Sequence, residues 1–442
     1  MSSRLASGGL LIDRSRPLSF SFDGQPLQGY EGDTLASALL ANDHVLTGRS
    51  FKYHRPRGIL ASGSEEPNAL MGIGEGARFE PNQRATTTAL HEGLVAISQN
   101  RWPSLKRDVG AVTNWLSKIA PIFPAGFYYK TFLWPRAAWK WVYEPVIRRA
   151  AGLGKPTTEA DPDRYEHFHA HVDTLVIGGG IAGLAAAREA AESGGEVLLV
   201  EQTAHWGGRA LVDGDRIDGQ DGADWVKAET AALGAMPNVH MRLRAMASGL
   251  YDHSYVLISE QVADHRPGLP GAPRHRLWRV RANRIVIATG ALERPLLFAN
   301  NDLPGVMLAS AVRDYIRLWG VLPGSLAVVF ANNDDAYRTA LALHEAGAVV
   351  AAVLDTRASV TGDLPARVRA LGIAVHERHG IDHAYGRHRV EAVEIRALDG
   401  AGPANGSERI ECDLVAVSGG WNPAVHLWSH CAGKLRWDED EA

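Results

Sequence analysis

Three glycines at the spacing Gly-x-Gly-x-x-Gly are the residues of this chain best suited to hold a phosphate-bearing ligand. Gly178, Gly180 and Gly183 stand in the stretch VDTLVIGGGIAGLAAAREAAESGGEVLLVE. At this spacing the first glycine permits a tight turn, the second lets a pyrophosphate approach the backbone, and the third lets a helix pack closely on a strand. Glu201 ends the stretch and could accept hydrogen bonds from both hydroxyls of an adenosine ribose. Together these residues predict a dinucleotide-binding turn.

The segments around the glycines have the patterns that such a turn requires. An apolar run precedes the turn, an Ala-rich helical pattern follows it, and a second apolar run leads to Glu201. The start of the helix would carry about half a positive charge toward the phosphates. A 2′-phosphate about 4 Å from Glu201 would meet a repulsion of about 4 kcal/mol per unit charge at an effective dielectric near 20, which disfavours NADP. The turn does not separate NAD from FAD, because both place an ADP half on it.

Two later segments resemble signatures of the two-dinucleotide-domain flavoprotein superfamily. One is EQTAHWGGRAL, which begins at the ribose acid, and the other is NRIVIATGALERP, where a strand is expected to end. The resemblance implies that the first supports the nucleotide and that the second marks the crossing into a nested domain. It also implies that the backbone in MRLRAMASGLYD pairs with the adenine. The candidate residues from these segments are Gly208, Arg209, Ala247, Thr289 and Gly290.

A second strand–turn–helix–strand pattern occurs in SLAVVFANNDDAYRTALALHEAGAVVAAVLD, without the glycines. Ala331, Asn333 and Ala336 stand where glycine would be expected. Asp334 and Asp335 would repel a pyrophosphate. We therefore expect a nested structural domain with a degenerate nucleotide turn, and no second nucleotide.

The first hundred residues predict a small α+β domain. RPLSFSFDGQPLQGYEGD alternates apolar and polar residues around an Asp-Gly turn, which is typical of a hairpin. DTLASALLANDH predicts a short helix that is capped by Asp33 or Thr34 and buries Leu35, Leu39 and Leu40. This order is that of ferredoxin-like domains, and the loop FKYHRPRGILASGSEEPN lies where the ligands of a cluster would be.

Composition leads to several expected absences. The only cysteines are Cys412 and Cys431, whereas plant-type clusters need four closely spaced thiolates, so we expect no iron–sulfur cluster, no metal site and no disulfide framework. A net charge of -4 gives no reason to expect nucleic acid. No apolar run is long enough for a signal peptide or a membrane span, so we expect a cytoplasmic protein without a membrane partner.

An aromatic-rich segment follows the first domain. Its tryptophans are interleaved with basic residues: Trp102, Trp115, Trp134, Trp139 and Trp141. Such residues could stack on single-stranded nucleic acid, but the acidic balance of the chain argues against that use. A buried core or a surface that faces a partner fits the segment better, because aromatic residues are enriched at protein interfaces.

Four stretches together make the chain similar to the alpha subunits of heterotetrameric sarcosine oxidases. They are RSFKYHRPRGI, GGGIAGLAAAREAA, ATGALERPLLFANNDLPGVMLASAVRDYI and DLVAVSGGWNPAVHLWSHCAGKL. The resemblance covers nearly all of the chain and implies a tightly bound NAD on the first Rossmann domain. The contacts it implies are made by Ala182, Glu201, Gln202, Thr203, Arg209 and Ala247.

The same resemblance implies an activity that needs other chains. FAD would lie in a beta subunit and FMN at the boundary of alpha and beta, with gamma and delta subunits completing the enzyme. Sarcosine would be oxidised to glycine with hydrogen peroxide, and its one-carbon unit would leave as formaldehyde or pass to tetrahydrofolate. The amine chemistry would belong to another chain, so we name no catalytic residue here.

The chain also departs from that family. It stops at KLRWDEDEA, before the strand that in the family returns to the first Rossmann domain and closes the nucleotide site, and the folate domain is missing. We expect either a shortened subunit or a fragment, whose nucleotide site is closed only in part. The alternatives are a related amine, opine or hydroxyproline dehydrogenase, a free-standing NADH:flavin oxidoreductase, and a non-catalytic assembly subunit. The preferred amine and the electron acceptor are not identified by the sequence.

Basic residues in YHRPR allow two interpretations. His54, Arg55 and Arg57 could approach an anionic flavin phosphate, which arginine binds with two parallel hydrogen bonds. Alternatively, they fix the loop that stands at the expected cluster site, and we favour this second interpretation.

The expected fold is α/β, a two-dinucleotide-domain Rossmann-type flavoprotein-like fold preceded by a small cluster-less ferredoxin-like α+β domain. The expected parts are a ferredoxin-like domain (1–100), an aromatic-rich connecting segment (101–165), a Rossmann domain (166–300), a nested Rossmann-like domain (301–411) and a truncated return to the first Rossmann domain (412–442).

Overall fold

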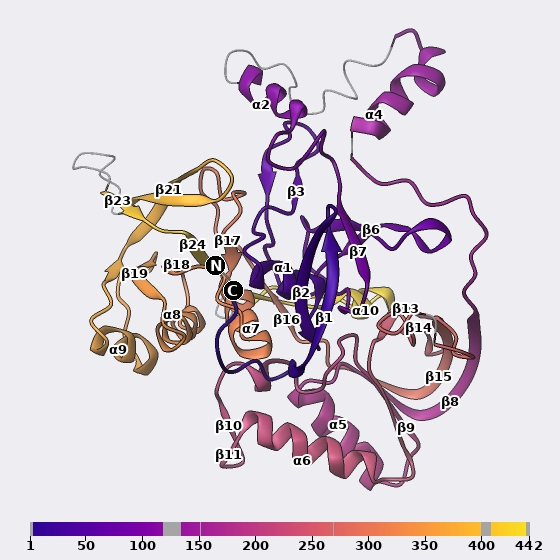
Figure 1. The fold of residues 1–442 in the computed structure, drawn as a ribbon. Helices are drawn as coiled ribbons and strands as arrows, with labels where there is room; N and C mark the ends of the chain where they lie inside the picture. Colours follow the sequence, from indigo (N-terminus) through magenta and orange to yellow (C-terminus); the bar gives the residue numbers. More distant parts are fainter. Residues whose placement is uncertain (1–2, 118–133, 151, 268, 399–407, 439–442) are drawn as a thin grey trace. The chain divides into compact units, whose positions relative to one another are not determined.

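The computed structural model describes residues 3–117, 134–150, 152–267, 269–398 and 408–438. The chain divides into two compact units, each made of two stretches of sequence (Figure 1). Unit 1 comprises Met1–Asp161 and Pro295–Gly419, and unit 2 comprises Pro162–Arg294 and Gly420–Ala442. Each unit has its own sheets and its own hydrophobic core.

The first part of unit 1 is a five-stranded sheet with one short helix. Its strands run in the order β2-β1-β7-β5-β6. The predicted hairpin is confirmed, because β1 and β2 pair antiparallel around Asp23 and Gly24, both of which have positive φ. The bounds are β1 (Asp13–Phe22), β2 (Gln25–Glu31), β5 (Leu70–Ile73), β6 (Glu80–Arg84) and β7 (Leu94–Ser98), with the short pair β3 (Gly48–Arg49) and β4 (Pro56–Arg57) and the 3₁₀ turn η1 (Gly76–Arg78).

Helix α1 (Leu35–Ala41) forms the core of this first part. Thr34 is its N-cap and exchanges hydrogen bonds with Ser37 in a capping box, and all seven residues of the helix are buried. The predicted cap and buried face are thereby confirmed. A helix this short is stable only through such packing.

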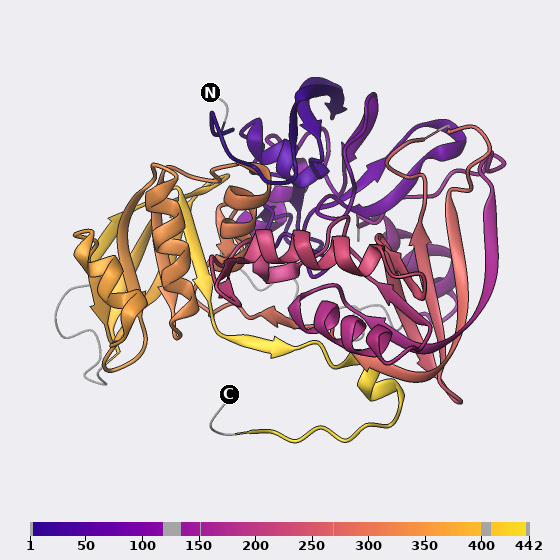
Figure 2. The same ribbon diagram turned by 90° about the horizontal axis from the view of Figure 1, so that it is seen from below.

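The second part of unit 1 is a three-layered α/β domain. A parallel sheet in the order β17-β24-β18-β19-β20 lies between the helices α8 and α9 and the antiparallel strands β21 to β23 (Figures 1 and 2). Apolar strand residues such as Val328, Leu354 and Val415 form its core. The bounds are β17 (Val306–Leu308), α7 (Ala309–Trp319), β18 (Leu326–Ala331), α8 (Asp335–Glu345), β19 (Val349–Asp355), α9 (Asp363–Ala370), β20 (Val375–Glu377), β21 (His379–Gly386), β22 (Val390–Ala397), β23 (Glu408–Glu411) and β24 (Leu414–Ser418).

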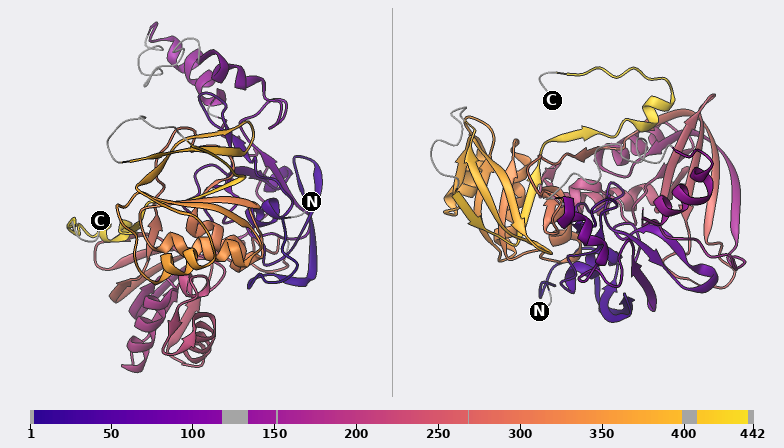
Figure 3. Two further views of the ribbon diagram at one scale, coloured as in Figure 1. Left: turned by 90° about the vertical axis from the view of Figure 1, so that its left-hand side faces the viewer. Right: turned by 90° about the horizontal axis from the view of Figure 1, so that it is seen from above.

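Unit 2 is built on a six-stranded sheet in the order β12-β9-β8-β15-β14-β13. The first four strands are parallel, and β13 and β14 extend the sheet as an antiparallel meander. Figure 3 shows the yellow helix α10 beside this meander, where the His430 imidazole accepts a hydrogen bond from Leu250 N. The bounds are β8 (Tyr165–Ile177), α5 (Ile181–Glu192), β9 (Val197–Val200), η4 (Gly208–Leu211), β10 (Arg216–Ile217), β11 (Gln220–Asp221), α6 (Gly222–Gly234), β12 (Val239–Arg242), β13 (Ala245–Tyr251), β14 (Tyr255–Gln261), β15 (His275–Ile287), β16 (Ala291–Glu293), β25 (Trp421–Pro423) and α10 (His426–His430).

The aromatic-rich segment of unit 1 forms short helical turns. They are η2 (Val109–Ala111), α2 (Val112–Ser117), the π-helical turn η3 (Trp139–Tyr143) and α4 (Glu144–Ala150). Residues 118–133 of this segment lie outside the described part of the chain. Among the helices that the structure describes, none combines the length and the apolar character needed to cross a lipid bilayer.

Candidate functional site

The glycine-rich turn joins β8 to α5 at the carboxyl end of the parallel strands of unit 2. Gly178 has φ of +108°, and a Cβ built there would lie 2.2 Å from Ala288 O. A Cβ on Gly183 would lie 1.8 Å from Gly178 O. Both positions therefore require glycine because the backbone itself fills the space a side chain would need. These contacts bring the turn, the start of α5 and the end of β15 together.

Gly180 differs from the other two glycines of the fingerprint. A Cβ built on it meets no atom within 4 Å, and its backbone has φ of -77° and ψ of -173°, which any residue can adopt. Gly180 is the N-cap of α5, so the first N–H groups of that helix have no partner within the helix. Ala182 is exposed in the first turn of α5. The protein thus leaves open the space in front of a helix N-terminus, where an anion is stabilised.

Glu201 follows β9 directly and is held in place by two backbone groups. Its Oε2 accepts a hydrogen bond from Gly179 N at 2.7 Å, and its Oε1 accepts one from Thr203 N at 2.8 Å. Each carboxylate oxygen can accept a second hydrogen bond. The side chain is therefore fixed beside the turn and keeps acceptor capacity for hydroxyl groups. Gln202 is exposed next to it.

The loop after Glu201 packs directly on the glycine-rich turn. Gly207 N donates to Gly179 O at 2.8 Å, and a Cβ on Gly208 would lie 3.3 Å from the Cα of Gly180. Arg209 forms an ion pair with Asp213. Its guanidinium carbon also lies 5.7 Å from the ring centre of Trp421.

Trp206 is a neighbour of the turn that sequence reasoning missed. A Cβ on Gly179 would lie 2.4 Å from Cε3 of this indole. Trp206 stands in the loop EQTAHWGGRAL, five residues after Glu201, so its position in the sequence was a usable signal.

The remaining candidates come from strands beside the turn. Arg244 N donates to Thr203 O, and Ala245 N donates to Glu201 O, both at 2.8 Å. Ala247 lies two residues further along β13, immediately before a bulge in its pairing with β14. The start of β13 is thus adjacent to the segment that carries Glu201.

Thr289 and Gly290 are held by the returning end of the chain. Thr289 Oγ1 donates to Ala424 O at 2.7 Å, and Gly290, with φ of +68°, accepts from Ala424 N at 2.9 Å. Strand β25 pairs with β16 directly beyond these residues. Sequence reasoning missed this contribution of residues 421–424, although their WNP motif was part of the quoted resemblance.

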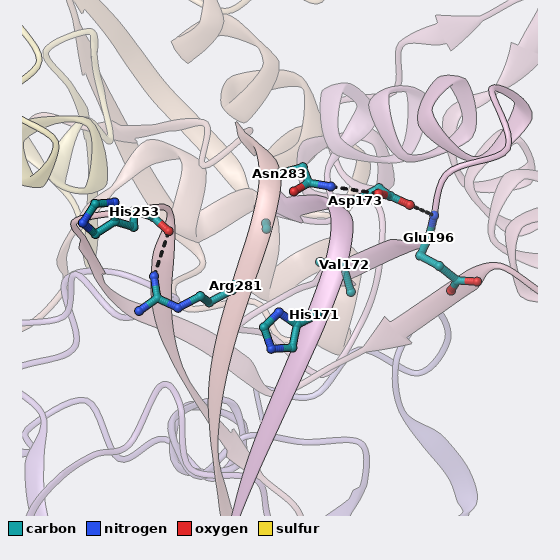
Figure 4. Close-up of a pocket in the computed structure, with 8 residues that line it drawn as sticks. His171, Val172, Asp173, Glu196, His253, Arg281 and Asn283 are labelled. Atoms are coloured by element: carbon teal, nitrogen blue, oxygen red, sulfur yellow. Dashed lines mark hydrogen bonds between the residues drawn. The ribbon is translucent and has the colours of Figure 1, made fainter.

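A separate polar pocket of about 340 Å³ lies on unit 2 (Figure 4), and its lining includes none of Gly178, Gly180 and Gly183. His171, Asp173 and Glu196 line it, and the last two lie upstream of the carboxyl ends of β8 and β9. Asp173 accepts hydrogen bonds from Glu196 N and Asn283 Nδ2, both at 2.9 Å. Nucleotides bind outside the carboxyl ends of parallel strands, so this pocket does not lie where the sequence predicts a dinucleotide.

The basic residues of the YHRPR loop are occupied within unit 1. Arg55 Nε donates to Asp302 at 2.7 Å, and Arg57 forms an ion pair with the same carboxylate. Burial disfavours the charged form of Asp302, but the hydrogen bond from Arg55 and the charge of Arg57 hold its pKa below its ordinary value. His54 Nδ1 lies 2.7 Å from Asp108 Oδ2. This geometry favours the interpretation that these residues fix the loop.

Glu66 organises the rest of that loop. The side chain is 1% exposed, and its two oxygens accept four backbone hydrogen bonds, from the N–H groups of residues 60, 61, 68 and 69, at 2.7 to 3.1 Å. A carboxylate surrounded by four donors closes the loop on itself.

The degenerate turn of the nested domain is filled by its own side chains. Asp355 stands at the end of β19, the position that corresponds to Glu201, and is fully buried. Arg357 binds it with Nε and Nη2 at 3.0 and 2.8 Å, and Tyr337 donates to it at 3.0 Å. Arg357 also pairs with Asp334 at 2.7 Å. These partners occupy the carboxylate that a ribose would need.

Two family models match the chain. One, described as pyridine nucleotide-disulphide oxidoreductase, matches residues 172–441, and the other, described as a 2Fe-2S iron-sulfur cluster binding domain, matches residues 15–101. The second match contradicts the expectation of a cluster-less domain without an iron–sulfur cluster, and that expectation is withdrawn. It was based on the resemblance and on the cysteines, Cys412 and Cys431, which lie outside the matched residues, whereas the family model matches the pattern of the domain as a whole.

Curated relatives confirm the resemblance drawn from the four stretches. Sarcosine oxidase subunit alpha of Rhizobium meliloti (strain 1021) is 48% identical over 440 residues, which are 99% of this chain and 43% of the relative. Sarcosine oxidase subunit alpha of Corynebacterium sp. (strain P-1) is 39% identical over 435 residues, which are 97% of this chain and 40% of the relative. The chain therefore spans less than half the length of the curated relatives it matches.

A solved structure shares the fold. The crystal structure of L-proline dehydrogenase from P. horikoshii superimposes with a TM-score of 0.63 at 20% identity, covering 99% of this chain and 66% of that chain. At this identity the similarity concerns the fold alone. The expected α/β class is confirmed as a dinucleotide-binding Rossmann-type fold with an α/β N-terminal domain.

Proposed function

The chain belongs to the pyridine nucleotide-disulphide oxidoreductase family, and we propose that it is the dinucleotide-binding part of a sarcosine oxidase alpha subunit. The identity of 48% across nearly the whole chain supports this assignment. The chain then belongs to an oxidoreductase that acts on the CH–NH bond of sarcosine. Its products are glycine, hydrogen peroxide and a one-carbon unit that leaves as formaldehyde or on folate.

We assign NAD to the glycine-rich turn of unit 2. The observation that carries this assignment is the open space in front of Gly180, flanked by a helix N-terminus and by a fixed carboxylate at Glu201. A pyrophosphate fits such a space because its charge is stabilised by the N–H groups of the helix. The residues proposed to hold the nucleotide are Gly178, Gly180, Ala182, Gly183, Glu201, Gln202, Thr203, Gly208, Arg209, Ala247, Thr289 and Gly290.

Glu201 selects the nucleotide in this proposal. Its two oxygens are oriented by Gly179 N and Thr203 N, so the remaining lone pairs can accept the two ribose hydroxyls. The same carboxylate would repel a 2′-phosphate by about 4 kcal/mol per unit charge at about 4 Å, so NAD is bound and NADP is excluded.

The chain binds its nucleotide and leaves the amine chemistry to other subunits. NAD, when bound, supplies a nicotinamide that can accept a hydride. The residues of this chain would hold the ADP half, and the N–H groups at the start of α5 would stabilise the charge of the pyrophosphate. We place FAD in a beta subunit and FMN at the boundary of alpha and beta, with gamma and delta subunits in the same assembly. We also propose that the domain boundaries of the chain follow residues 100, 165, 300 and 411.

Mass-spectrometric identification of the nucleotide released on denaturation of the purified chain tests the assignment. NAD in a near-stoichiometric amount is the expected result. FAD in its place would overturn the choice of nucleotide and indicate a flavin-binding dehydrogenase. A chain that releases no nucleotide and binds none from added NAD would overturn the site itself.

A further inference from the structure

Among the residues that the structure describes, an aromatic surface on unit 1 is left exposed. We call it the tryptophan surface and define it as residues 134–148, which include η3 and most of α4 (Figure 1). Trp134 is 83% exposed, Trp141 75% and Trp139 45%. None of the fifteen residues is buried. A soluble chain rarely exposes large apolar side chains in such density unless another molecule covers them.

The local structure of this surface also calls for a partner. Helix α4 has seven residues, and the turn before it has five. Isolated helices of fewer than about 12 residues are marginal in water, and most helices in proteins are stabilised by packing of an apolar face. The described part of the chain buries none of these residues, so we infer that another molecule supplies the missing packing.

The charges of the surface define the chemistry of that partner. Its sequence WPRAAWKWVYEPVIR contains three basic residues and one acid. The acid, Glu144, is already paired with Arg148 one turn away. Arg136 and Lys140 are exposed among the tryptophans, and the Lys140 ammonium lies 4.9 Å from the ring centre of Trp141. An apolar cleft with an acidic rim is complementary to this arrangement.

We propose that the tryptophan surface docks into such a cleft on another subunit of the same oxidase. This inference rests on the proposed function, because the relatives are named as subunits of a larger enzyme. Tryptophan and arginine are the residue types that dominate binding energy at protein interfaces. A lipid surface is less suitable, because Glu144 pairs with Arg148 and offsets part of the positive charge that anionic lipids would attract.

Two double variants test the proposal in the full chain produced together with the other sarcosine oxidase subunits. Trp134→Ser with Trp141→Ser changes the proposed surface. Trp428→Ser with Trp437→Ser is the matched control in unit 2, where these indoles are 48% and 65% exposed. Neither pair is buried, so both variants should keep the melting temperature of the wild-type chain.

The expected result is a loss of affinity in the first variant only. Its dissociation constant for the other subunits, measured by analytical ultracentrifugation, should rise roughly 30-fold or more, as for other interface tryptophans. An unchanged constant would overturn the docking surface while leaving the proposed function intact. A wild-type chain that does not assemble with these subunits at all would instead contradict the proposed function.

The same variants test two other possible binding partners of the tryptophan surface, a lipid membrane and a second copy of the chain. Binding of the wild-type chain alone to phosphatidylcholine–phosphatidylglycerol vesicles, lost on changing Trp134 and Trp141, would overturn the proposal in favour of a membrane. A dimer of the chain alone that the same change converts to a monomer would overturn it in favour of a second copy. The expected result in both measurements is no difference between variant and wild type.

Discussion

Substitution of Gly180 by alanine separates binding of the nucleotide from folding of the protein. The added methyl group meets no protein atom within 4 Å, and the backbone conformation at this position suits any residue. Alanine should therefore be neutral or stabilising by about 0.4 to 1 kcal/mol, because it restricts the unfolded chain. Gly183→Ala is the opposite case, since its methyl group would lie 1.8 Å from Gly178 O and disrupt the turn.

The methyl group of Gly180→Ala would occupy the space assigned to the pyrophosphate. Extra methyl groups in a well-packed contact cost about 1 to 3 kcal/mol. This range corresponds to a loss of roughly 5- to 150-fold in affinity for NAD. The variant should therefore lose affinity for NAD without losing thermal stability. A variant with a damaged fold would instead lose both.

Calorimetric titration of NAD into the nucleotide-free chain measures the affinity, and thermal unfolding measures the stability. Gly234→Ala is the matched control. It too adds a methyl group in open space, at the end of α6 in the same unit. The control should bind NAD as the wild type does. Wild-type affinity in Gly180→Ala would refute the reasoning, because the pyrophosphate could then not lie against this glycine.

Three further substitutions follow from individual carboxylates. Glu201→Gln places an amide N–H₂ group against a backbone N–H, so the affinity for NAD should fall about 10-fold or more in calorimetric titration. The control is Glu196→Gln at the other end of β9, which should leave the affinity for NAD unchanged. Glu66→Gln should lower the free energy of unfolding by about 1 to 3 kcal/mol in denaturant titration, because a buried amide cannot accept all four N–H groups; an unchanged midpoint would contradict this. Asp302→Asn should lower the melting temperature at pH 7. The pKa of the Asp302 carboxyl is lower in the folded state, so its ionised form adds to the free energy of unfolding above about pH 4. This contribution is lost as the pH falls further, and the difference in melting temperature between variant and wild type should shrink there. A difference that is constant from pH 7 to pH 3 would contradict the ion-pair explanation.

Local sequence patterns were sufficient where one short segment determines its own structure. The Asp-Gly hairpin and the capped helix α1 formed as expected, because turn chemistry and capping act within a few residues. The strand, turn and helix around Gly178 did so too, since Gly178 and Gly183 are each confined by backbone atoms of the same unit.

Contacts between distant segments could not be predicted in this way. Asp302 pairs with Arg55 and Arg57 across more than two hundred residues, and no local pattern relates these positions. The same holds for Ala424, which returns from the end of the chain to Thr289. The cluster expectation failed for a related reason, because counting cysteines ignores the rest of the domain that the family model matches.

The two Rossmann-type turns of this chain share one sequence pattern, but the acids that follow them have different surroundings. Both end their second strand in an acid, but Glu201 accepts backbone N–H groups and keeps lone pairs for a ligand, whereas Asp355 is fully buried beneath Arg357 and Tyr337. A buried carboxylate that loses its partners is costly, so a nucleotide at the second turn would have to displace a side-chain network before it could bind. At the first turn a Cβ built on Gly180 meets no atom within 4 Å, so no such side-chain network lies against this glycine. The two turns thus differ in the long side chains that surround the acid at the end of the second strand. We therefore predict that removing Arg357 would destabilise the nested domain without creating a second nucleotide site.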